Sequence, residues 1–442
     1  MRNQTQGTGR RRSRTITAVV AASVIATSLS AGTVSIASAA SACEGVTLNV
    51  LFPQPHQGAA ELLTADFSAA TGATINPTIV PYDEVAAKAT LDAQSGANTF
   101  DVVDTFYINV GALAEDGILL DLTDWIESDE NLDPADFIGS VYDPYSLNGG
   151  RRYGVPFDGD THVLFYNTEI LERNGITEPP ATWDEYLADV KTITENEKAN
   201  GIYGAAILGQ KSPVILGSSY VNRLAGFGGA FLDENGQPVL DSEAAIAAAQ
   251  ALLDVAPYAL PTPQETAFDQ ALPAFLNGQV AFMEFWTDLG TYAEGPDSQI
   301  SGKWGVTSLP TGGDNTTPIA ALNAGFVLGV TAATQKKDCA LEFIEYASST
   351  ATNLKLITTT GSGIDPVRIS SLNAPEYAAF NSKVQAAAAT ALNGALAWPT
   401  VPAAPKLFQE LTDGLSALLD GQGTPAEILA QVNESWKAEL AD

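Results

Sequence analysis

The chain has 442 residues, with 52 acidic against 21 basic side chains and a formal net charge of −31. Such an acidic surface repels nucleic acid and anionic lipid, so we expect no nucleic-acid partner. Five arginines lie in the first 14 residues, before an Ala-rich apolar stretch at 16–36 that ends in small residues. This pattern predicts a signal peptide within residues 1–42 and an exported protein, placed in the periplasm or outside the cell.

Cys43 and Cys339 are the two cysteines of the chain. Export places them in an oxidising compartment, where a free thiol would be unusual, so a disulfide between them is favoured. The alternative is cleavage just before Cys43, which would give a lipid-anchored cysteine at the cell surface. Cys339 would then be a small buried side chain.

The first part of the expected mature chain alternates strands and helices. Apolar residues alternate at 46–52, and strands are also expected at 75–80 and 100–104. The intervening helices, 58–71 and 83–94, are each stopped by a glycine. This order predicts a β-α-β-α-β unit with parallel strands, in which ligands bind beyond the carboxyl ends of the strands.

A second set of elements follows and indicates a second lobe. Strands are expected at 153–156, 161–167, 203–208, 279–283, 304–309 and 319–330, helices at 183–197 and 243–254, and further helices to the end of the chain. The fold class is therefore α/β with two lobes.

The carboxyl-end rule selects two loops of the first lobe, 52–57 and 104–107, and favours Tyr107 at the rim of a cleft. Asp158 and Asp160 are two residues apart, so an extended backbone directs both to the same face. They could bind sugar hydroxyls or act as an acid/base pair. Trp286 follows a predicted strand and could lie in the cleft or the core. Asp288 beside it could bind ligand or cap a helix.

Three later residues could either bind ligand or have a structural role. Trp398 lies in a loop interrupted by proline and could face the cleft or the core. Arg368 follows a glycine-containing loop and could bring a guanidinium to the cleft, or form a surface salt bridge. Asn323 offers an amide between two apolar runs, or could stand in a turn. No nucleophile elbow, zinc-protease motif or P-loop occurs, so we expect no enzyme activity, no cofactor and no metal.

Four groups of segments together resemble the family 1 extracellular solute-binding proteins, the maltodextrin-binding type. They are FDVVD at 100–104 with EDGIL at 115–119, YGVP at 153–156 with LFYN at 164–167, FLNGQVAFM at 275–283, and KKDCALEFI at 336–344. Their order covers nearly the whole expected mature chain.

The resemblance implies the two-lobed periplasmic-binding-protein fold of type II, with a ligand cleft between lobes that close about a hinge. It implies a monomeric receptor of an ABC importer that passes ligand to a membrane permease. The implied lobes are residues 43–157 plus 287–330 and residues 158–286 plus 331–442. Crossings between them are expected near 157–161, 282–287 and 330–336.

The resemblance also implies ligand contacts. Asp160 matches a carboxylate that binds sugar hydroxyls, and Trp286 matches an aromatic residue that follows a strand. The other positions it implies are Gln54, His56, Thr105, Tyr107, Tyr220 and Arg223. Phe408 stands where the family has a tryptophan, which argues against a long maltodextrin and leaves small sugars and polyols open.

The sequence is compatible with three functions. A sugar or polyol receptor is favoured by carboxylates and aromatic faces in both lobes. A polyamine or other cation receptor is favoured by Asp104, Asp158, Asp160 and Asp288 around an acidic cleft. A secreted glycoside hydrolase would need two carboxylates across the scissile bond.

Overall fold

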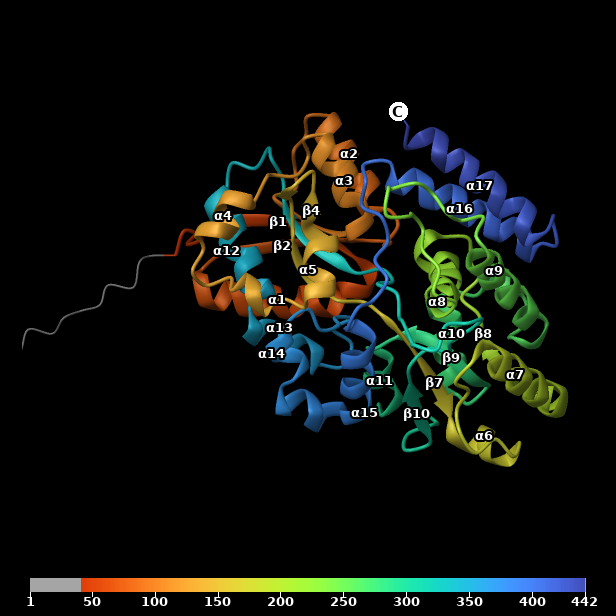
Figure 1. Ribbon diagram of the computed structural model, residues 1–442. Coiled ribbons are helices and arrows are strands. Elements are labelled where there is room, and N and C mark those ends of the chain that lie inside the picture. The colour runs from red at the N-terminus through yellow and green to blue at the C-terminus, as the bar shows by residue number, and fades with distance from the viewer. Residues whose placement is uncertain (1–40, 442) are drawn as a thin grey trace, which may run out of the picture. The chain divides into compact units, whose positions relative to one another are not determined.

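The computed structural model describes residues 41–441, so nearly all of the predicted signal peptide lies outside the described residues. No helix among residues 41–441 is long and apolar enough to cross a membrane. The described chain contains two main sheets with helices packed around them (Figure 1).

The first sheet has the strand order β2-β1-β3-β11-β6. β1 pairs in parallel with both β2 and β3, which confirms the predicted β-α-β-α-β unit. β11 returns from much later in the chain and pairs antiparallel with β3 and β6. The elements are β1 (Thr47–Pro53), α1 (Gln57–Thr71), β2 (Thr74–Val80), α2 (Val85–Gln94), β3 (Val102–Phe106), β6 (Val155–Asp158) and β11 (Phe326–Val330).

The second sheet has the order β10-β7-β9-β8. β7 is antiparallel to β9 and β10, whereas β8 runs parallel to β9. Helix α7 begins at a capping box in which Thr182 and Glu185 satisfy each other's backbone N–H groups. The elements are β7 (His162–Asn167), α7 (Trp183–Glu197), β8 (Tyr203–Ala206), α8 (Ser218–Gly226), α9 (Glu243–Val255), α10 (Phe268–Leu276), β9 (Val280–Trp286), α11 (Leu289–Ala293) and β10 (Trp304–Thr307).

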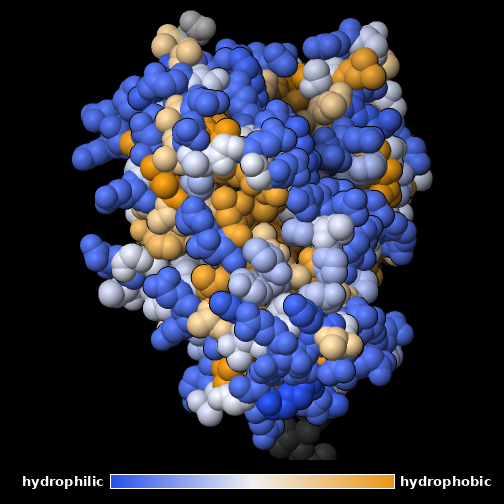
Figure 2. Space-filling model, turned by 90° about the vertical axis from the view of Figure 1, so that its right-hand side faces the viewer, coloured by the Kyte–Doolittle hydropathy of each residue, from blue (hydrophilic) through white to orange (hydrophobic). Residues whose placement is uncertain are grey.

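The remaining elements are mostly helices, as the sequence predicts for the end of the chain. They are α3 (Val110–Glu115), α4 (Thr123–Ser128), α5 (Gly139–Ser146), β4 (Leu147–Asn148), β5 (Arg151–Arg152), α6 (Thr168–Arg173), α12 (Lys337–Ser348), α13 (Thr350–Ile357), α14 (Ile369–Leu372), α15 (Pro375–Leu392), α16 (Ala404–Leu419) and α17 (Pro425–Glu439). On the side of the molecule where α7, α9 and α17 lie, hydrophilic residues dominate the surface, and hydrophobic residues gather near its middle (Figure 2).

The chain passes from the first sheet to the second at residues 159–161, between β6 and β7. It does not leave the second sheet after β9, because β10 still pairs with β7. The return to the first sheet is made by residues 308–325, and α12 then packs against β11 and β6 of the first sheet.

The strand expected at 319–330 is shorter in the structure and is confined to β11. Side chains, rather than a full neighbouring strand, bind the carbonyls just before it. Thr161 Oγ1 donates to the Ala321 carbonyl, and Tyr107 OH donates to the Leu322 carbonyl. Trp286 Nε1 donates to the Asn323 carbonyl at 2.9 Å.

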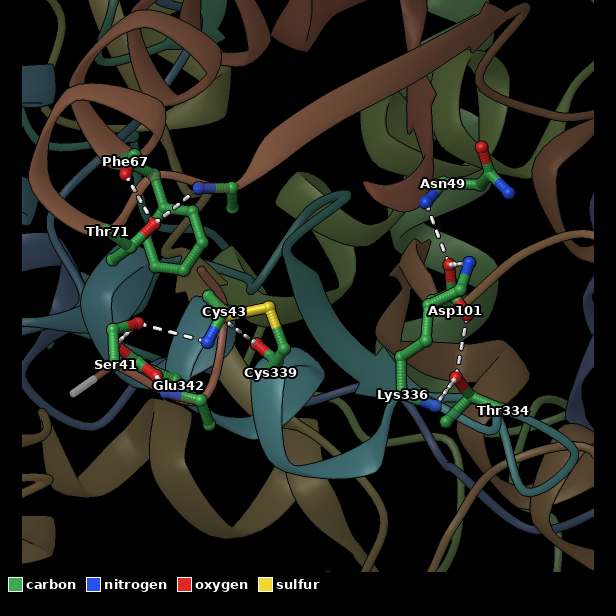
Figure 3. Close-up of a disulfide and its surroundings, with 12 residues drawn as sticks. Ser41, Cys43, Asn49, Phe67, Thr71, Asp101, Thr334, Lys336, Cys339 and Glu342 are labelled. Carbon is green, nitrogen blue, oxygen red and sulfur yellow. Dashed lines mark hydrogen bonds and ion pairs between the residues drawn. A yellow bond between two sulfur atoms is a disulfide. The ribbon is translucent and has the colours of Figure 1, made fainter. Parts of the chain in front are cut away.

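A disulfide joins Cys43, just before β1, to Cys339 on α12, which confirms the predicted pairing (Figure 3). Both cysteines are buried. The Cys43 sulfur is therefore not free to carry a lipid. Near the disulfide, Asp101 accepts hydrogen bonds from the Asn49 backbone N–H and from Lys336 Nζ (Figure 3). The start of the described chain is thus fastened to a helix 296 residues later.

Reduction of this disulfide should destabilise the protein by about 2 to 5 kcal/mol, because the unfolded chain regains the freedom of a long closed loop. Thermal melts with and without a reductant measure the effect. The Cys43→Ser/Cys339→Ser double variant should melt at the temperature of the reduced protein and should not respond to the reductant. An unchanged melting temperature on reduction would contradict the prediction.

Candidate functional site

A cavity of about 430 Å³ lies beyond the ends of strands from both sheets. This volume is within the range of small-molecule sites. Its polar and aromatic lining is supplied by Gln54, His56, Tyr82, Asp158, Asp160, Gln210, Phe268, Asp269, Trp286, Asp288, Tyr292 and Phe326. Neither lysine nor arginine occurs among the residues of the described chain that line it.

The wall on the side of the first sheet is built around His56. This residue ends the short turn Gln54–His56 that follows β1, and its side chain is fully buried. Its Nδ1 lies 2.6 Å from Asp104 Oδ2, and its Nε2 lies 3.0 Å from Asp158 Oδ2. Burial alone would lower the pKa of His56, but the two carboxylates outweigh it and raise the pKa to about 10. His56 is therefore a cation that donates to both.

The next part of the wall is the crossing segment after β6. The second oxygen of Asp158 accepts a hydrogen bond from the Asp365 backbone N–H at 2.6 Å. Asp160, two residues later, lines the same cavity, as the spacing predicts. The carboxylates of Asp158, Asp160 and Asp365 offer oxygens that lie within 4.8 Å of one another. Burial, followed by the charges of its acidic neighbours, raises the pKa of Asp160 well above its usual range.

Asp365 lies in a loop that is held against the turn after β1. Gly363 in this loop has φ +70°, and a Cβ there would lie 2.2 Å from the Pro55 carbonyl oxygen, so glycine is required. The Asp365 carboxylate accepts hydrogen bonds from the backbone N–H and the hydroxyl of Thr287. The loop thus fastens the segment that follows β9 and leads to Asp288.

Asp288 directly precedes α11 and lines the cavity. Its Oδ1 is buried and has no hydrogen-bond partner in the described chain. Burial, followed by the charge of Asp158, raises the pKa of Asp288 to about 7. The helix-cap alternative is not observed for its side chain, because no cap hydrogen bond forms.

Aromatic side chains cover much of the remaining wall. Trp286, at the end of β9, lines the cavity and is 6% exposed, and its indole is held by the hydrogen bond to the Asn323 carbonyl. Phe268 lies beside it, with 6.2 Å between ring centroids. Tyr82 and Tyr292 are half-buried. The cavity therefore presents apolar ring faces together with carboxylates.

Several residues expected to bind ligand lie behind the cavity wall. Arg223 on α8 is fully buried, pairs with Glu284 at 2.8 Å, and has its guanidinium over the Trp183 ring. Tyr220 is also fully buried and donates to the Ala245 carbonyl. These two side chains do not line the cavity and instead pack the second sheet against its helices. His162 bonds to Asn222, and burial lowers its pKa to about 3, as suits a neutral core histidine.

Three more expected contacts form a buried cluster that does not line the cavity. Tyr107 accepts a hydrogen bond from the Trp398 backbone N–H, and Asn323 Oδ1 accepts one from the Trp398 indole. Asn323 also donates to Asn222 on α8. Thr105 is fully buried within β3. Asn323 acts on the cavity only indirectly, because its backbone carbonyl accepts the hydrogen bond from the Trp286 indole.

Arg368 does not bring its guanidinium to the cavity. The side chain is buried with its guanidinium 4.0 Å from the Phe137 ring centroid, and it donates to the carbonyls of Leu132, Asp133 and Ser348. The loop before it does reach the site, but through Gly363 and Asp365. In this loop it is Asp365, and not Arg368, that contacts a residue of the cavity wall.

Other lining residues were missed by the sequence reasoning. Tyr82 follows β2, so the carboxyl-end rule, applied to the second strand as well as the first and third, would have found it. Gln210 follows β8 in the same way. Phe268 and Asp269 begin α10, and no local pattern marks them as cavity residues.

The comparisons with known proteins agree with this architecture. Residues 53–353 match the family model described as bacterial extracellular solute-binding protein. A probable ABC transporter-binding protein of Deinococcus radiodurans is 30% identical over 70% of this chain and 73% of its own length. The diacetylchitobiose binding protein of Streptomyces coelicolor is 27% identical over 86% of both chains. A solute binding protein from Agrobacterium radiobacter, solved in complex with ribitol, has a TM-score of 0.80 and 24% identity, and the match covers 89% of this chain and 99% of that chain.

The fold is that of the two-lobed solute-binding receptors of ABC transporters. The chain belongs to the family of bacterial extracellular solute-binding proteins. It is a binding protein and not an enzyme, so the glycoside hydrolase alternative is set aside.

Asp288 predicts an unusual pH dependence of stability in the empty protein. Its folded pKa of about 7 exceeds the unfolded value of about 3.9, so the folded state binds the proton more tightly. Protonated Asp288 therefore contributes fully to the free energy of unfolding below pH 4, and this contribution is lost as the pH rises through 7. Asp288→Asn should raise the melting temperature at pH 8 by about 2 °C or more relative to wild type, and much less at pH 4. An equal effect at both pH values would contradict this account.

The Arg223–Glu284 pair predicts a structural role that can be separated from ligand binding. Arg223→Met should destabilise the protein by about 3 to 5 kcal/mol, because it leaves Glu284 buried and unpaired. The Arg223→Met/Glu284→Met double variant should recover more than half of that loss. Urea unfolding measures both variants. Strictly additive losses would show that the two side chains do not act as a pair.

Proposed function

We propose that this protein is the receptor of an ABC importer for a small sugar or polyol, which it binds between its two lobes and delivers to a membrane permease. The observation that carries the proposal is the cavity itself, where Asp158, Asp160 and Asp288 meet the rings of Trp286 and Phe268. Carboxylates accept hydrogen bonds from hydroxyl groups, and aromatic faces cover the C–H faces of a sugar. The relatives that bind diacetylchitobiose and ribitol support the same class of ligand.

The proposal includes closure of the lobes about the ligand. The cavity is lined from the side of the first sheet by His56 and Tyr82, and from the side of the second by Gln210 and Phe268. A ligand that contacts both sides favours the closed arrangement by its extra contacts there. We infer that the permease recognises this closed form, and that the receptor acts as a monomer outside the cytoplasmic membrane.

The lobe assignment is part of the proposal and follows sheet membership. The first lobe would consist of residues 43–158 with β11 and the helices α12 and α13 that pack near it. The second would contain residues 162–307 with α15, which packs against β10 and β7. The hinge would then include residues 159–161 and 308–325.

A polyamine is the second candidate ligand, and the group of carboxylates at the cavity favours it. A thermal-shift screen separates the two candidates, because a ligand that binds the folded state raises the melting temperature by mass action. The panel contains mono-, di- and oligosaccharides, polyols, polyamines and amino acids. We expect the largest shift from a sugar or polyol. A response to putrescine or spermidine alone would contradict the proposal.

Asp160→Ala should weaken binding of the best compound by about 1 to 3 kcal/mol, because a hydroxyl of the ligand loses its acceptor. Isothermal titration calorimetry measures the change. Asp116→Asn is the matched control, since Asp116 is an exposed carboxylate outside the cavity. Equal affinities of wild type and Asp160→Ala would remove Asp160 from the binding site.

A further inference from the structure

Among the described residues, the wall of the cavity holds more carboxylates than its one cation, His56, can neutralise. Asp104, Asp158, Asp160, Asp288 and Asp365 lie in one connected region, and His56 is the cation among them. His56 is already shared by Asp104 and Asp158. Asp365 is satisfied by Thr287. Of these five, Asp160 and Asp288 face the cavity without a cationic partner from the described chain, and Asp269 on α10 adds a further carboxylate to the lining.

Asp160 is the group that most clearly lacks a donor. Its side chain is 9% exposed, and it lines the cavity. Its carboxylate neighbours are Asp158 and Asp365, and one oxygen of each of the three groups lies within 4.8 Å of the others. Two carboxyl groups can share a hydrogen bond only while one of them holds a proton. A cationic donor placed beside Asp160 would remove that requirement.

Asp288 provides a second, independent indication. Its Oδ1 is buried and unpartnered, although buried polar atoms almost always find a partner. Asp288 is two residues after Trp286 in the sequence, and the side chains of Trp286 and Tyr292 line the same cavity. Aromatic faces attract cations as well as sugar rings. Two carboxylates without a cationic partner from the described chain thus meet the aromatic faces in one cavity.

We propose that the ligand is a polyhydroxylated amine, such as an amino sugar or an amino polyol, whose ammonium group is held by Asp160 and Asp288. This inference rests on the proposed function and makes its ligand class narrower. Hydroxyl groups of the same ligand are bound by Asp158 and covered by Trp286. A neutral polyol offers Asp160 no positively charged hydrogen-bond donor. It therefore binds more weakly than the corresponding amino polyol.

Matched compounds test the proposal on the intact mature protein. The pairs are D-glucosamine with D-glucose and N-acetyl-D-glucosamine, and 1-amino-1-deoxysorbitol with sorbitol. Putrescine serves as an amine without hydroxyls, and calcium chloride as a metal cation. Calorimetry should show that the amino compound of each pair binds about 10- to 100-fold more tightly, as expected for a hydrogen bond to a charged group.

The variant Asp160→Asn keeps the shape of the side chain and removes its charge. It should abolish most of the preference for the amine while the neutral compounds bind as before or more tightly. Asp116→Asn removes one charge from an exposed position outside the cavity, so it should keep the wild-type preference. Melting temperatures of both variants, measured in the same buffer, identify any loss of folding.

The outcomes separate this inference from the proposed function. Neutral sugars or polyols that bind as tightly as their amino counterparts overturn the inference and leave the proposed function intact. Binding of calcium with no preference for amines also overturns it, because the carboxylates would then hold a metal. Putrescine binding as tight as that of the amino sugar shows that hydroxyls contribute nothing, which overturns the proposed function as well.

Discussion

The imidazole of His56 joins the carboxylates of Asp104, within β3, and Asp158, at the end of β6. The rest of the site is arranged around this buried cation. Without it, two carboxylates would be buried with no opposite charge, which is costly in a dry interior. Because Asp158 also accepts the Asp365 backbone N–H, the same cation positions the loop that fastens Thr287 and hence Asp288. One charge therefore fixes segments that are far apart in the sequence.

The segment that precedes β11 provides a second set of links between the sheets. Its backbone carbonyls accept three side-chain hydrogen bonds. The donors are Tyr107, which directly follows β3 of the first sheet, Thr161 in the segment between the sheets, and Trp286 in β9 of the second sheet. Trp286 is in this way both a wall of the cavity and a fixed part of the framework. The Trp286 ring therefore connects the cavity directly to the segment that links the sheets.

Local patterns in the sequence predicted the framework well. The alternation at 46–52, together with glycine stops after the helices, correctly predicted β1 to β3 and their parallel order. The cysteine count predicted the disulfide. The carboxyl-end rule placed Gln54 and His56 at the cavity, and the two-residue spacing placed Asp158 and Asp160 there together.

The failures have a common physical cause, because the partner that decides the role of a polar residue is distant in the sequence. Arg223 is paired with Glu284, and Arg368 is bound by carbonyls at 132–133 and 348. No local pattern reveals such partners. Asp365 was missed for the same reason, since its importance comes from contacts with Asp158 and Thr287.

The most direct test of the account is a crystal structure of the protein with the compound that gives the largest thermal shift. The account predicts that the compound lies in the cavity, in contact with Trp286 and with Asp160, and reaches residues of both lobes. A compound bound elsewhere on the protein, or in the cavity without contact to either residue, would contradict it.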